Sequence, residues 1–148
     1  MDLKEYSSSS SNEKLLRLLD ANFNRAREGL RVIEDIHRFC YKNQQENILI
    51  LKKFRHNLAE CEKEYRIRLP LLQSRDTEND CGTKITLKDE ISRNGLSDVA
   101  AGNFKRIEES LRVIEEIGKL LLPKLTIKIK SLRYGCYEIE KSLAKEDK

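Results

Sequence analysis

The chain has few of the residues that make tight turns. Of its 148 residues only 6 are glycine and 2 are proline, and tryptophan is absent. A β-sandwich needs a turn signal about every 8–12 residues, so this class is excluded. Charged residues make up 36% of the sequence, which together with so little glycine and proline is typical of long amphipathic helices. We therefore predict an all-α protein with one main domain.

Long apolar stretches are also missing. The longest aliphatic runs are Ile48–Leu51 and Leu120–Leu122, whereas a membrane span needs about 20 apolar residues. The N-terminal segment is acidic and then serine-rich, without the apolar core of a signal peptide. We therefore expect a cytoplasmic protein that does not bind membranes. Nucleic acid is not an expected partner, because the net charge is only +4 and 29 basic residues are interleaved with 25 acidic ones.

The cysteines and histidines lack the spacing of a zinc site. The cysteines are Cys40, Cys61, Cys81 and Cys136, and none of them forms a C-x-x-C pair. One H-x-x-C pair starts at His37, but no second pair matches it. We expect reduced cysteines and structural roles for His37 and His56.

A fifteen-residue segment occurs twice in the chain. Asn22–Ile36 and Asn103–Ile117 are identical at 10 of 15 positions, at an offset of 81. A weaker similarity at an offset of 78 relates 52–63 to 130–141. Each half therefore resembles the same helix–turn–helix unit. Because two copies are too few for a solenoid, we predict a helical bundle of two repeated units with pseudo-two-fold symmetry and a central irregular loop.

Element boundaries follow from apolar periodicity and from helix start and stop signals. Pro70 is expected to end the second helix, since proline disfavours helix continuation, and Thr86 with Asp89 resembles a capping box for a short helix. The predicted elements are a first helix from Ser11 or Asn12 to Tyr41, a second over Glu46–Leu69, a loop over Gln73–Lys84, a short helix ending near Asn94, a third long helix over Ser97–Leu122, and a last helix from Pro123 to the charged tail Lys145–Lys148. We predict a flexible tail over 1–12 and one helical domain over 13–145, divided into repeat one (13–69), central loop (70–86) and repeat two (87–145).

Each copy of the repeat has an apolar stripe with polar residues beside it. The residues predicted to be core are Leu30, Val32, Ile33, Ile36, Leu111, Val113, Ile114 and Ile117. The residues predicted to form a solvated lattice of ion pairs are Glu28, Arg31, Asp35, Glu109, Arg112 and Glu116.

A second set of polar residues lies closer to the stripe. Asn22 falls about 40–60° from the stripe centre, and Arg25 lies on the same flank. Asn103 and Arg106 repeat the arrangement. A guanidinium beside a core needs a buried acid or a bound anion. An anion-binding cleft and an interhelical Arg–Glu pair both satisfy this requirement.

The central loop concentrates polar chemistry between the two repeats. Ser74–Lys84 contains acidic, hydroxyl, glycine and basic residues within eleven positions. Such a loop can offer carboxylates to Mg²⁺, and backbone N–H groups and a lysine to phosphate; it can equally be a polar turn. The sequence has no phosphate-binding P-loop, no dinucleotide-binding glycine motif, and no serine-nucleophile or His–Glu zinc motif.

Three ordered motifs resemble a known family. They are Asp20-Ala-Asn-x-x-Arg-x-x-Glu-Gly-Leu-Arg31, Arg75-Asp-Thr-x-x-Asp-x-Gly-Thr83, and Asn103-x-x-Arg-x-x-Glu-x-Leu-Arg-x-x-Glu-Glu116. Their order resembles the small all-helical hydroxymethylpyrimidine-phosphate kinases of bacterial thiamin biosynthesis, over about Leu19–Leu120. The same domain is also found fused ahead of thiamin-phosphate synthase, and its members are often labelled thiamin-phosphate pyrophosphorylase. Gly102 and Cys81 depart from the pattern, but neither is a polar motif residue.

The resemblance implies ATP- and Mg²⁺-dependent conversion of hydroxymethylpyrimidine monophosphate to the diphosphate. Phosphoryl transfer needs charge neutralisation, Mg²⁺ and in-line positioning. In this hypothesis Arg75, Asp76 and Asp80 are catalytic, and the two aspartates hold Mg²⁺. The expected phosphate-binding and substrate-binding residues are Asn22, Arg25, Asn103, Arg106, Gly82, Thr83 and Lys84.

Two alternatives compete with a kinase. The first is a domain associated with thiamin-phosphate synthase; synthase activity itself belongs to a (β/α)₈ barrel, which 148 helical residues cannot build. The second is a non-enzymatic helical interaction module whose charged faces bind a partner such as the synthase. Phe39, Tyr41 and the last helix also offer a face for a homodimer.

Overall fold

The computed structural model describes residues 10–144, all of them in helices and the turns that join them. The helices are α1 (Ser10–Phe39), α2 (Gln45–Glu64), α3 (Arg68–Ser74), α4 (Leu96–Leu121) and α5 (Pro123–Leu143), with the single-turn 3₁₀ helices η2 (Cys81–Lys84) and η3 (Lys88–Glu90). Residues 10–144 contain no strand, so the predicted all-α class is confirmed. Within the same range, no helix combines the length and the apolarity needed to cross a membrane.

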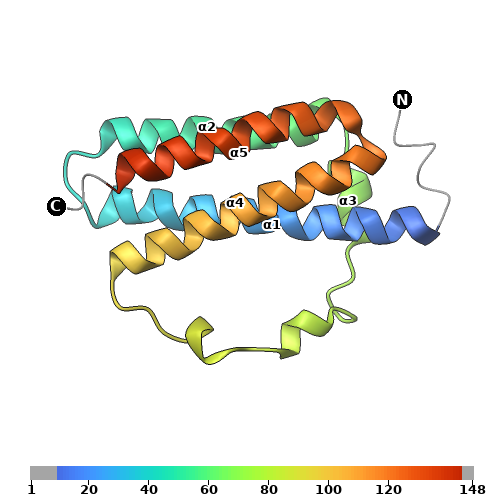
Figure 1. Cartoon of the computed structure of the whole chain (residues 1–148), viewed down its shortest axis with the longest axis horizontal. Helices are drawn as coiled ribbons and strands as arrows, with labels where there is room; N and C mark the ends of the chain where they lie inside the picture. Colours follow the sequence, from blue (N-terminus) through green and yellow to red (C-terminus); the bar gives the residue numbers. More distant parts are fainter. Residues whose placement is uncertain (1–9, 145–148) are drawn as a thin grey trace.

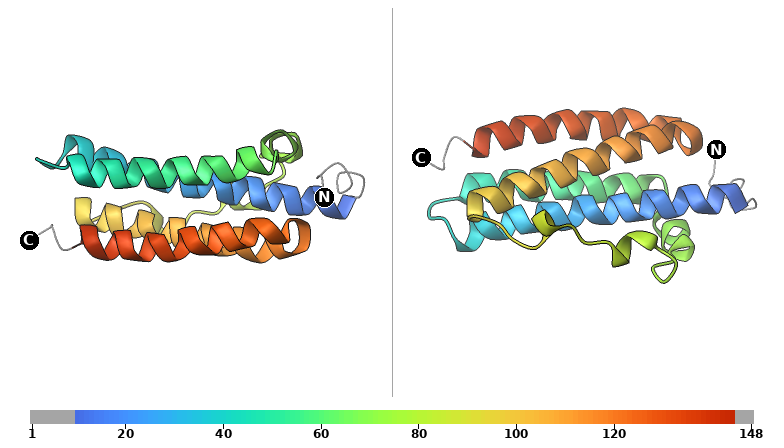
Figure 2. Two further views of the ribbon diagram at one scale, coloured as in Figure 1. Left: turned by 90° about the horizontal axis from the view of Figure 1, so that it is seen from above. Right: turned by 60° about the horizontal axis from the view of Figure 1, so that its bottom comes forward.

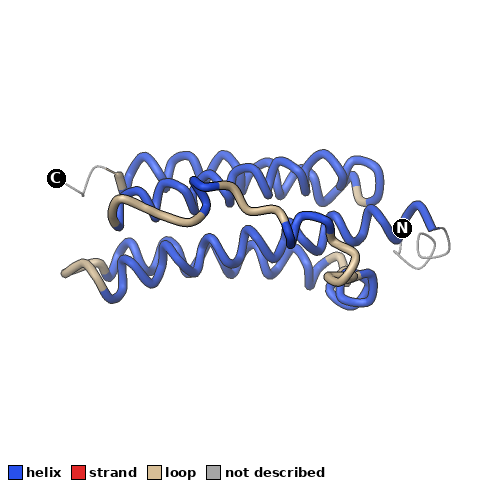
Figure 3. Tube along the Cα trace, turned by 90° about the horizontal axis from the view of Figure 1, so that it is seen from below, coloured by secondary structure: helices blue, strands red, loops and turns tan. Residues whose placement is uncertain are grey.

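The four long helices form a bundle of two hairpins. Helix α1 packs along α4, which gives the most extensive contact of the fold, and each pairs with its own second helix, α2 or α5. Helices α2 and α5 also touch and lie together on one side of the bundle (Figures 1 and 2). The short helix α3 closes one end against α1. The connection from α3 to α4 runs back along the side opposite α2 and α5 (Figures 1 and 3).

The duplicated segment supplies the centre of the core. Its apolar side chains are buried where α1 crosses α4, and they include Phe23, Leu30, Ile33, Phe104, Leu111 and Ile114. The crossing is close because Gly29 lies against α4: a Cβ atom there would be 2.9 Å from Ile107 Cγ1 and 3.1 Å from the Asn103 carbonyl oxygen. The core prediction is wrong for Val32, which is 36% exposed because it points away from this crossing.

The second predicted helix breaks earlier than Pro70. Helix α2 ends at Glu64, and the chain reverses through Arg66, whose φ of 52° is left-handed. Pro70 instead lies in the first turn of α3, where proline is tolerated because the N–H group it lacks would have no helical partner. Pro123 starts α5 for the same reason, as predicted.

The predicted boundaries of the central loop and the tails also shift. Ser74 belongs to α3, and Cys81–Lys84 forms η2 rather than irregular loop. The short predicted helix is the single turn η3, whose N-cap Leu87 provides no side-chain cap, so Thr86 does not open a capping box. Helix α1 begins at Ser10; the remainder of the predicted tail and Lys145–Lys148 lie outside the described residues.

The arginines of the predicted ion-pair lattice also reach two buried carboxylates that were not among its predicted members: Arg31 lies 3.6 Å from Glu34, and Arg112 lies 3.1 Å from Glu115. Glu34 and Glu115, one from each repeat, are buried. Arg55 Nε of α2 lies 3.1 Å from Glu34 Oε2, and Arg133 Nε of α5 lies 2.8 Å from Glu115 Oε2. The two repeats therefore share the same interhelical ion pair, which fixes each hairpin around a buried carboxylate.

A neighbouring pair breaks the symmetry. In the first repeat Arg27 pairs with the buried Glu62. At the equivalent places of the second repeat the chain has Glu108 and Glu140, and Lys105 Nζ lies 2.9 Å from Glu108 and 3.2 Å from Glu140. Burial raises the pKa of Glu108 to about 7. Its hydrogen bond with Glu140 also raises this pKa, whereas Lys105 lowers it. One half thus holds a salt bridge where the other half holds two carboxyls and one lysine.

Candidate functional site

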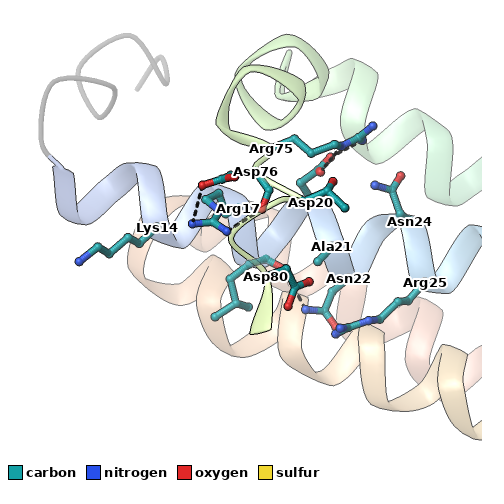
Figure 4. A pocket seen from close by; sticks show the side chains of 12 residues that line it. Lys14, Arg17, Asp20, Ala21, Asn22, Asn24, Arg25, Arg75, Asp76 and Asp80 are labelled. Carbon is teal, nitrogen blue, oxygen red and sulfur yellow. Dashed lines mark hydrogen bonds and ion pairs between the residues drawn. The ribbon is translucent and has the colours of Figure 1, made fainter. Parts of the chain in front are cut away.

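A cavity of about 490 Å³ lies between the first half of α1 and the segment that follows α3. Its lining brings together side chains from residues 14–25 and 75–80, as Figure 4 shows. The lining residues are Lys14, Arg17, Leu18, Asp20, Ala21, Asn22, Asn24, Arg25, Arg75, Asp76, Thr77 and Asp80. Five of the ten predicted site residues are therefore neighbours in space, although the two on α1 lie fifty or more positions before the other three in the sequence.

One salt bridge positions the two walls of this cavity. Arg75 binds the buried Asp20 with two hydrogen bonds, Nε to Oδ2 at 2.7 Å and Nη2 to Oδ1 at 2.9 Å (Figure 4). The hydrogen bond with Asp20 raises the pKa of Arg75. Bidentate pairing of this kind is among the strongest side-chain contacts. Arg75 therefore fixes the segment after α3 onto α1.

The carboxylates of the cavity are held in defined positions. Both Asp76 oxygens accept from Asn79 Nδ2, at 3.1 and 2.8 Å, and Arg17 Nη1 lies 3.6 Å from Asp76 Oδ2. The hydrogen bonds from Asn79 lower the pKa of Asp76. Asp80 caps η2, where its Oδ1 accepts from the Gly82 N–H at 2.8 Å. Both side chains remain partly accessible, so they can still meet a ligand.

The same carboxylates fit Mg²⁺ only with help from a ligand. No cluster of three or more His, Cys, Asp or Glu side chains able to hold a metal occurs within residues 10–144. Mg²⁺ is commonly bound by one or two carboxylates together with phosphate oxygens and water. Asp76 and Asp80 suit that second arrangement. A bound ion would neutralise charge between these carboxylates and a phosphate.

The cationic side of the cavity has free charge. Lys14 and Arg25 are exposed on α1, and neither forms an ion pair with any residue from 10 to 144. The interhelical Arg–Glu pair that competed with an anion cleft is therefore not formed by Arg25. Asn22 is buried, and its Nδ2 donates to the Leu18 carbonyl at 2.8 Å. The Asn22 amide is therefore bound within α1, whereas Arg25, about one turn further along the helix, is exposed.

The other predicted site residues do not line this cavity. Asn103 repeats the hydrogen bond of Asn22, because its Nδ2 donates to the Val99 carbonyl at 2.9 Å. Arg106 is exposed on α4. Gly82, Thr83 and Lys84 are exposed in η2, beyond the lining. The two repeats thus match in local structure but not in surroundings, since the segment 75–80 lines this cavity with α1 and no residue of α4 lines it.

Three charged lining residues were not predicted as site residues. Lys14, Arg17 and Asp20 precede the repeated segment, so comparison of the two copies could not find them. Two signals were available: Lys14 and Arg17 stand three apart, on the helical face that continues to Arg25, and Asp20 opens the first quoted motif.

Comparison with known proteins identifies the family. Residues 17–142 match the ThiD2 family. The chain belongs to the ThiD2 family. The match includes both hairpins and the segment that completes the cavity, so the family is defined by the whole bundle rather than by one repeat. No solved structure matches the chain significantly.

Curated relatives of this ThiD2 chain carry the name thiamine-phosphate synthase. The chain is 42% identical over 128 residues to the protein of Nostoc punctiforme, covering 86% of this chain and 34% of that protein. It is 41% identical over 129 residues to that of Synechocystis sp., covering 87% and 36%. It is 42% identical over 123 residues to that of Rhodopirellula baltica, covering 83% and 32%. The chain therefore spans about a third of the length of these relatives.

These relatives correct the predicted enzyme class. The prediction of a phosphotransferase, a phosphomethylpyrimidine kinase, is wrong: the relatives are named as synthases, which are transferases but not kinases. The physical reason is that arginines, amides and carboxylates recognise a phosphorylated ligand in any reaction and do not specify phosphoryl transfer. The coarser part of the resemblance, a ThiD2 family connected with thiamin biosynthesis, is supported.

Proposed function

We propose that this chain is a helical domain of thiamin biosynthesis that binds a hydroxymethylpyrimidine phosphate and works with thiamine-phosphate synthase. The observation that carries the proposal is the cavity on α1, where Lys14 and Arg25 are without an ion-pair partner among residues 10–144 beside two accessible carboxylates. The names of the relatives and their greater length support the association with a synthase.

The chemistry of the cavity suits a phosphate ester. Arg25 offers a planar fork of N–H donors, and Lys14 offers a point charge. Both lie on one rigid helix, so little ordering is needed when the ligand binds. Arg17, Asp76 and Asn79 form a hydrogen-bonded group that holds the opposite wall. Mg²⁺ would join Asp76 and Asp80 to the ligand's phosphate oxygens. In this proposal the domain presents the phosphorylated pyrimidine to the synthase.

The ligand prediction is tested by calorimetric titration of the chain with hydroxymethylpyrimidine diphosphate, with and without Mg²⁺. We expect Arg25→Ala to weaken binding by about 10-fold or more, the cost of losing a charge-assisted hydrogen bond. The matched control is Arg106→Ala, which removes the equivalent arginine of the second repeat outside the cavity. Equal losses from both variants would place the ligand between the repeats and contradict the assignment to this cavity.

The partner prediction is tested separately. The purified chain is added to a thiamine-phosphate synthase that lacks such a domain, at a pyrimidine diphosphate concentration below its KM. We expect a faster formation of thiamin phosphate with the chain than with its Arg25→Ala variant. Identical rates with the chain and with its Arg25→Ala variant would contradict the proposal that the chain works with the synthase. The predicted ATP ligand depended on the kinase and is not carried into this proposal.

A further inference from the structure

A second and larger cavity, of about 700 Å³, lies on the other side of the Asp20–Arg75 salt bridge. Its lining residues come from α1, the end of α2, the turn that follows it and the short helix α3. Asp20, Asn24 and Arg75 line both cavities. The remaining lining residues are Arg27, Ala59, Glu60, Glu62, Lys63, Arg66, Arg68, Leu69 and Leu72. Its volume is in the range of pockets that hold small organic ligands, about 300–1,000 Å³.

The lining of this cavity has an excess of positive charge. It contains five basic residues and three acidic ones. Arg27 pairs with Glu62, Arg75 with Asp20, and Lys63 Nζ lies 3.6 Å from Glu60. Arg66 and Arg68 form no ion pair with residues 10–144. Burial lowers the pKa of Arg27; the charge of Asp20 opposes this shift, and the charges of Arg68 and Arg75 add to it.

The backbone at Arg66 is left-handed. Arg66 has a φ of 52° at the end of α2, where its N–H donates to the Lys63 carbonyl at 3.1 Å and the Ile67 N–H donates to the Glu62 carbonyl at 3.1 Å. Glycine is the usual residue in such a left-handed helix end. An arginine there accepts a backbone cost and places a cation at the cavity.

Helix α3 adds an apolar wall. Leu69 is 61% exposed and Leu72 is 53% exposed, and both line the cavity. Pro70 in the first turn and the buried Leu71 hold this short helix in place. A cavity lined by two guanidinium groups that form no ion pair with residues 10–144 and by two exposed leucines suits a ligand with an anionic group at one end and a flat apolar ring at the other.

We propose that this cavity is a second ligand site, for an aromatic phosphate whose phosphate lies on Arg66 and Arg68 and whose ring lies on Leu69 and Leu72. The proposal goes beyond the function proposed above, since it concerns another cavity and different residues. Arg75 remains bound to Asp20 and forms the wall between the two sites.

The test is an NMR titration of the ¹⁵N-labelled chain with phenyl phosphate and, separately, with inorganic phosphate. We expect phenyl phosphate to shift the amide signals of residues 63–72 and to bind there about tenfold more tightly than inorganic phosphate, because the ring is partly removed from water. Arg68→Ala should weaken both ligands about fivefold or more. Leu69→Asn should remove the advantage of phenyl phosphate and leave inorganic phosphate unchanged.

Matched variants separate this site from the first cavity. Leu120→Asn changes a leucine that is also 61% exposed, on α4 outside the cavity, and should change neither affinity. Arg25→Ala should abolish shifts near residues 14–25 and leave those at 63–72, so failure of one site is distinguishable from failure of the other. Shifts confined to 14–25 and 76–80, equal affinities for the two ligands, or no saturable binding would each overturn the proposal.

Discussion

Glu108 gives the sharpest prediction about stability. This carboxyl is buried between α4 and α5, and its pKa is raised from 4.5 to about 7, chiefly by burial. The folded state therefore holds the proton more tightly than the unfolded state between these two pH values. Since stability falls with pH wherever the folded state binds more protons, ionisation of Glu108 should destabilise the fold as pH rises from 4.5 to above 7. Glu108→Gln keeps the shape of the protonated side chain and removes the ionisation.

The magnitude follows from the pKa. At about 1.36 kcal/mol per pH unit, a rise from 4.5 to about 7 corresponds to about 3 kcal/mol at full ionisation. The groups facing Glu108 are Lys105 on its own helix, and Glu140 and Cys136 on α5. The pKa of Cys136 is raised to about 12, mainly by burial, so this thiol stays neutral and contributes nothing to the change. We expect Glu108→Gln to equal the wild type in stability at pH 4 and to exceed it by about 2–3 kcal/mol at pH 8.5.

The assay is urea unfolding, followed by circular dichroism at 222 nm, at intervals from pH 4 to pH 8.5. Glu109→Gln is the matched control, because it makes the same change one residue away on the exposed face of α4. Its effect should stay within about 0.5 kcal/mol at every pH. A stability difference between Glu108→Gln and wild type that does not change with pH would refute the reasoning, as would the same pH dependence in the control.

Three further outcomes are expected. Gly29→Ala should lower the free energy of unfolding in urea by about 1–3 kcal/mol, because the added Cβ meets Ile107 and the Asn103 backbone. The control Gly102→Ala meets only the end of the Arg93 side chain and should leave the free energy of unfolding unchanged or raise it by up to about 1 kcal/mol. Equal effects would contradict the close crossing of α1 and α4. Arg75→Ala should release the segment after α3 and leave the helix content unchanged. Limited proteolysis within 75–95 should be about tenfold faster, because the free energy of local opening falls by at least about 1.4 kcal/mol. An unaltered cleavage rate would exclude the anchoring role. Among the four cysteines, the exposed Cys40 and Cys81 should react rapidly with a thiol reagent. Burial raises the pKa values of Cys61 and Cys136, so these two should react only on unfolding. Rapid reaction of all four thiols would contradict the packing of α2 and α5.

Sequence reasoning predicted the architecture because the information is local and repeated. The apolar spacing predicts which face of α1 and of α4 is buried, and the duplication predicts that the two hairpins are alike. The turn at Arg66 could not be predicted, because a left-handed arginine has no sequence signal of the kind that glycine provides. Pairs such as Arg27–Glu62 depend on how far one helix is shifted along another, and a single sequence does not contain that shift.

Site residues were predicted in both repeats, but the structure brings only those of the first repeat together with the central segment. Arg25, Asp76 and Asp80 meet in the cavity as expected, while Arg106 does not. Both arginines have the same local sequence, so local reasoning treated them as equal. What separates them is the segment 75–80, which is held on α1 by Asp20 and lines a cavity together with Arg25 but not with Arg106. Duplicated residues keep a shared function only where the surroundings are duplicated as well.

The connection between the repeats has a consequence for how the protein can be divided. Ile85, Leu87 and Ile91 in this connection are all largely exposed, and the contacts that unite the two halves run instead through α1 with α4 and α2 with α5. Opening the chain between Ile85 and Ile91 would leave each helical hairpin whole and both cavities on the N-terminal piece. The protein is therefore suited to reconstitution from two separately made polypeptides, and to the insertion of a reporter domain at this point.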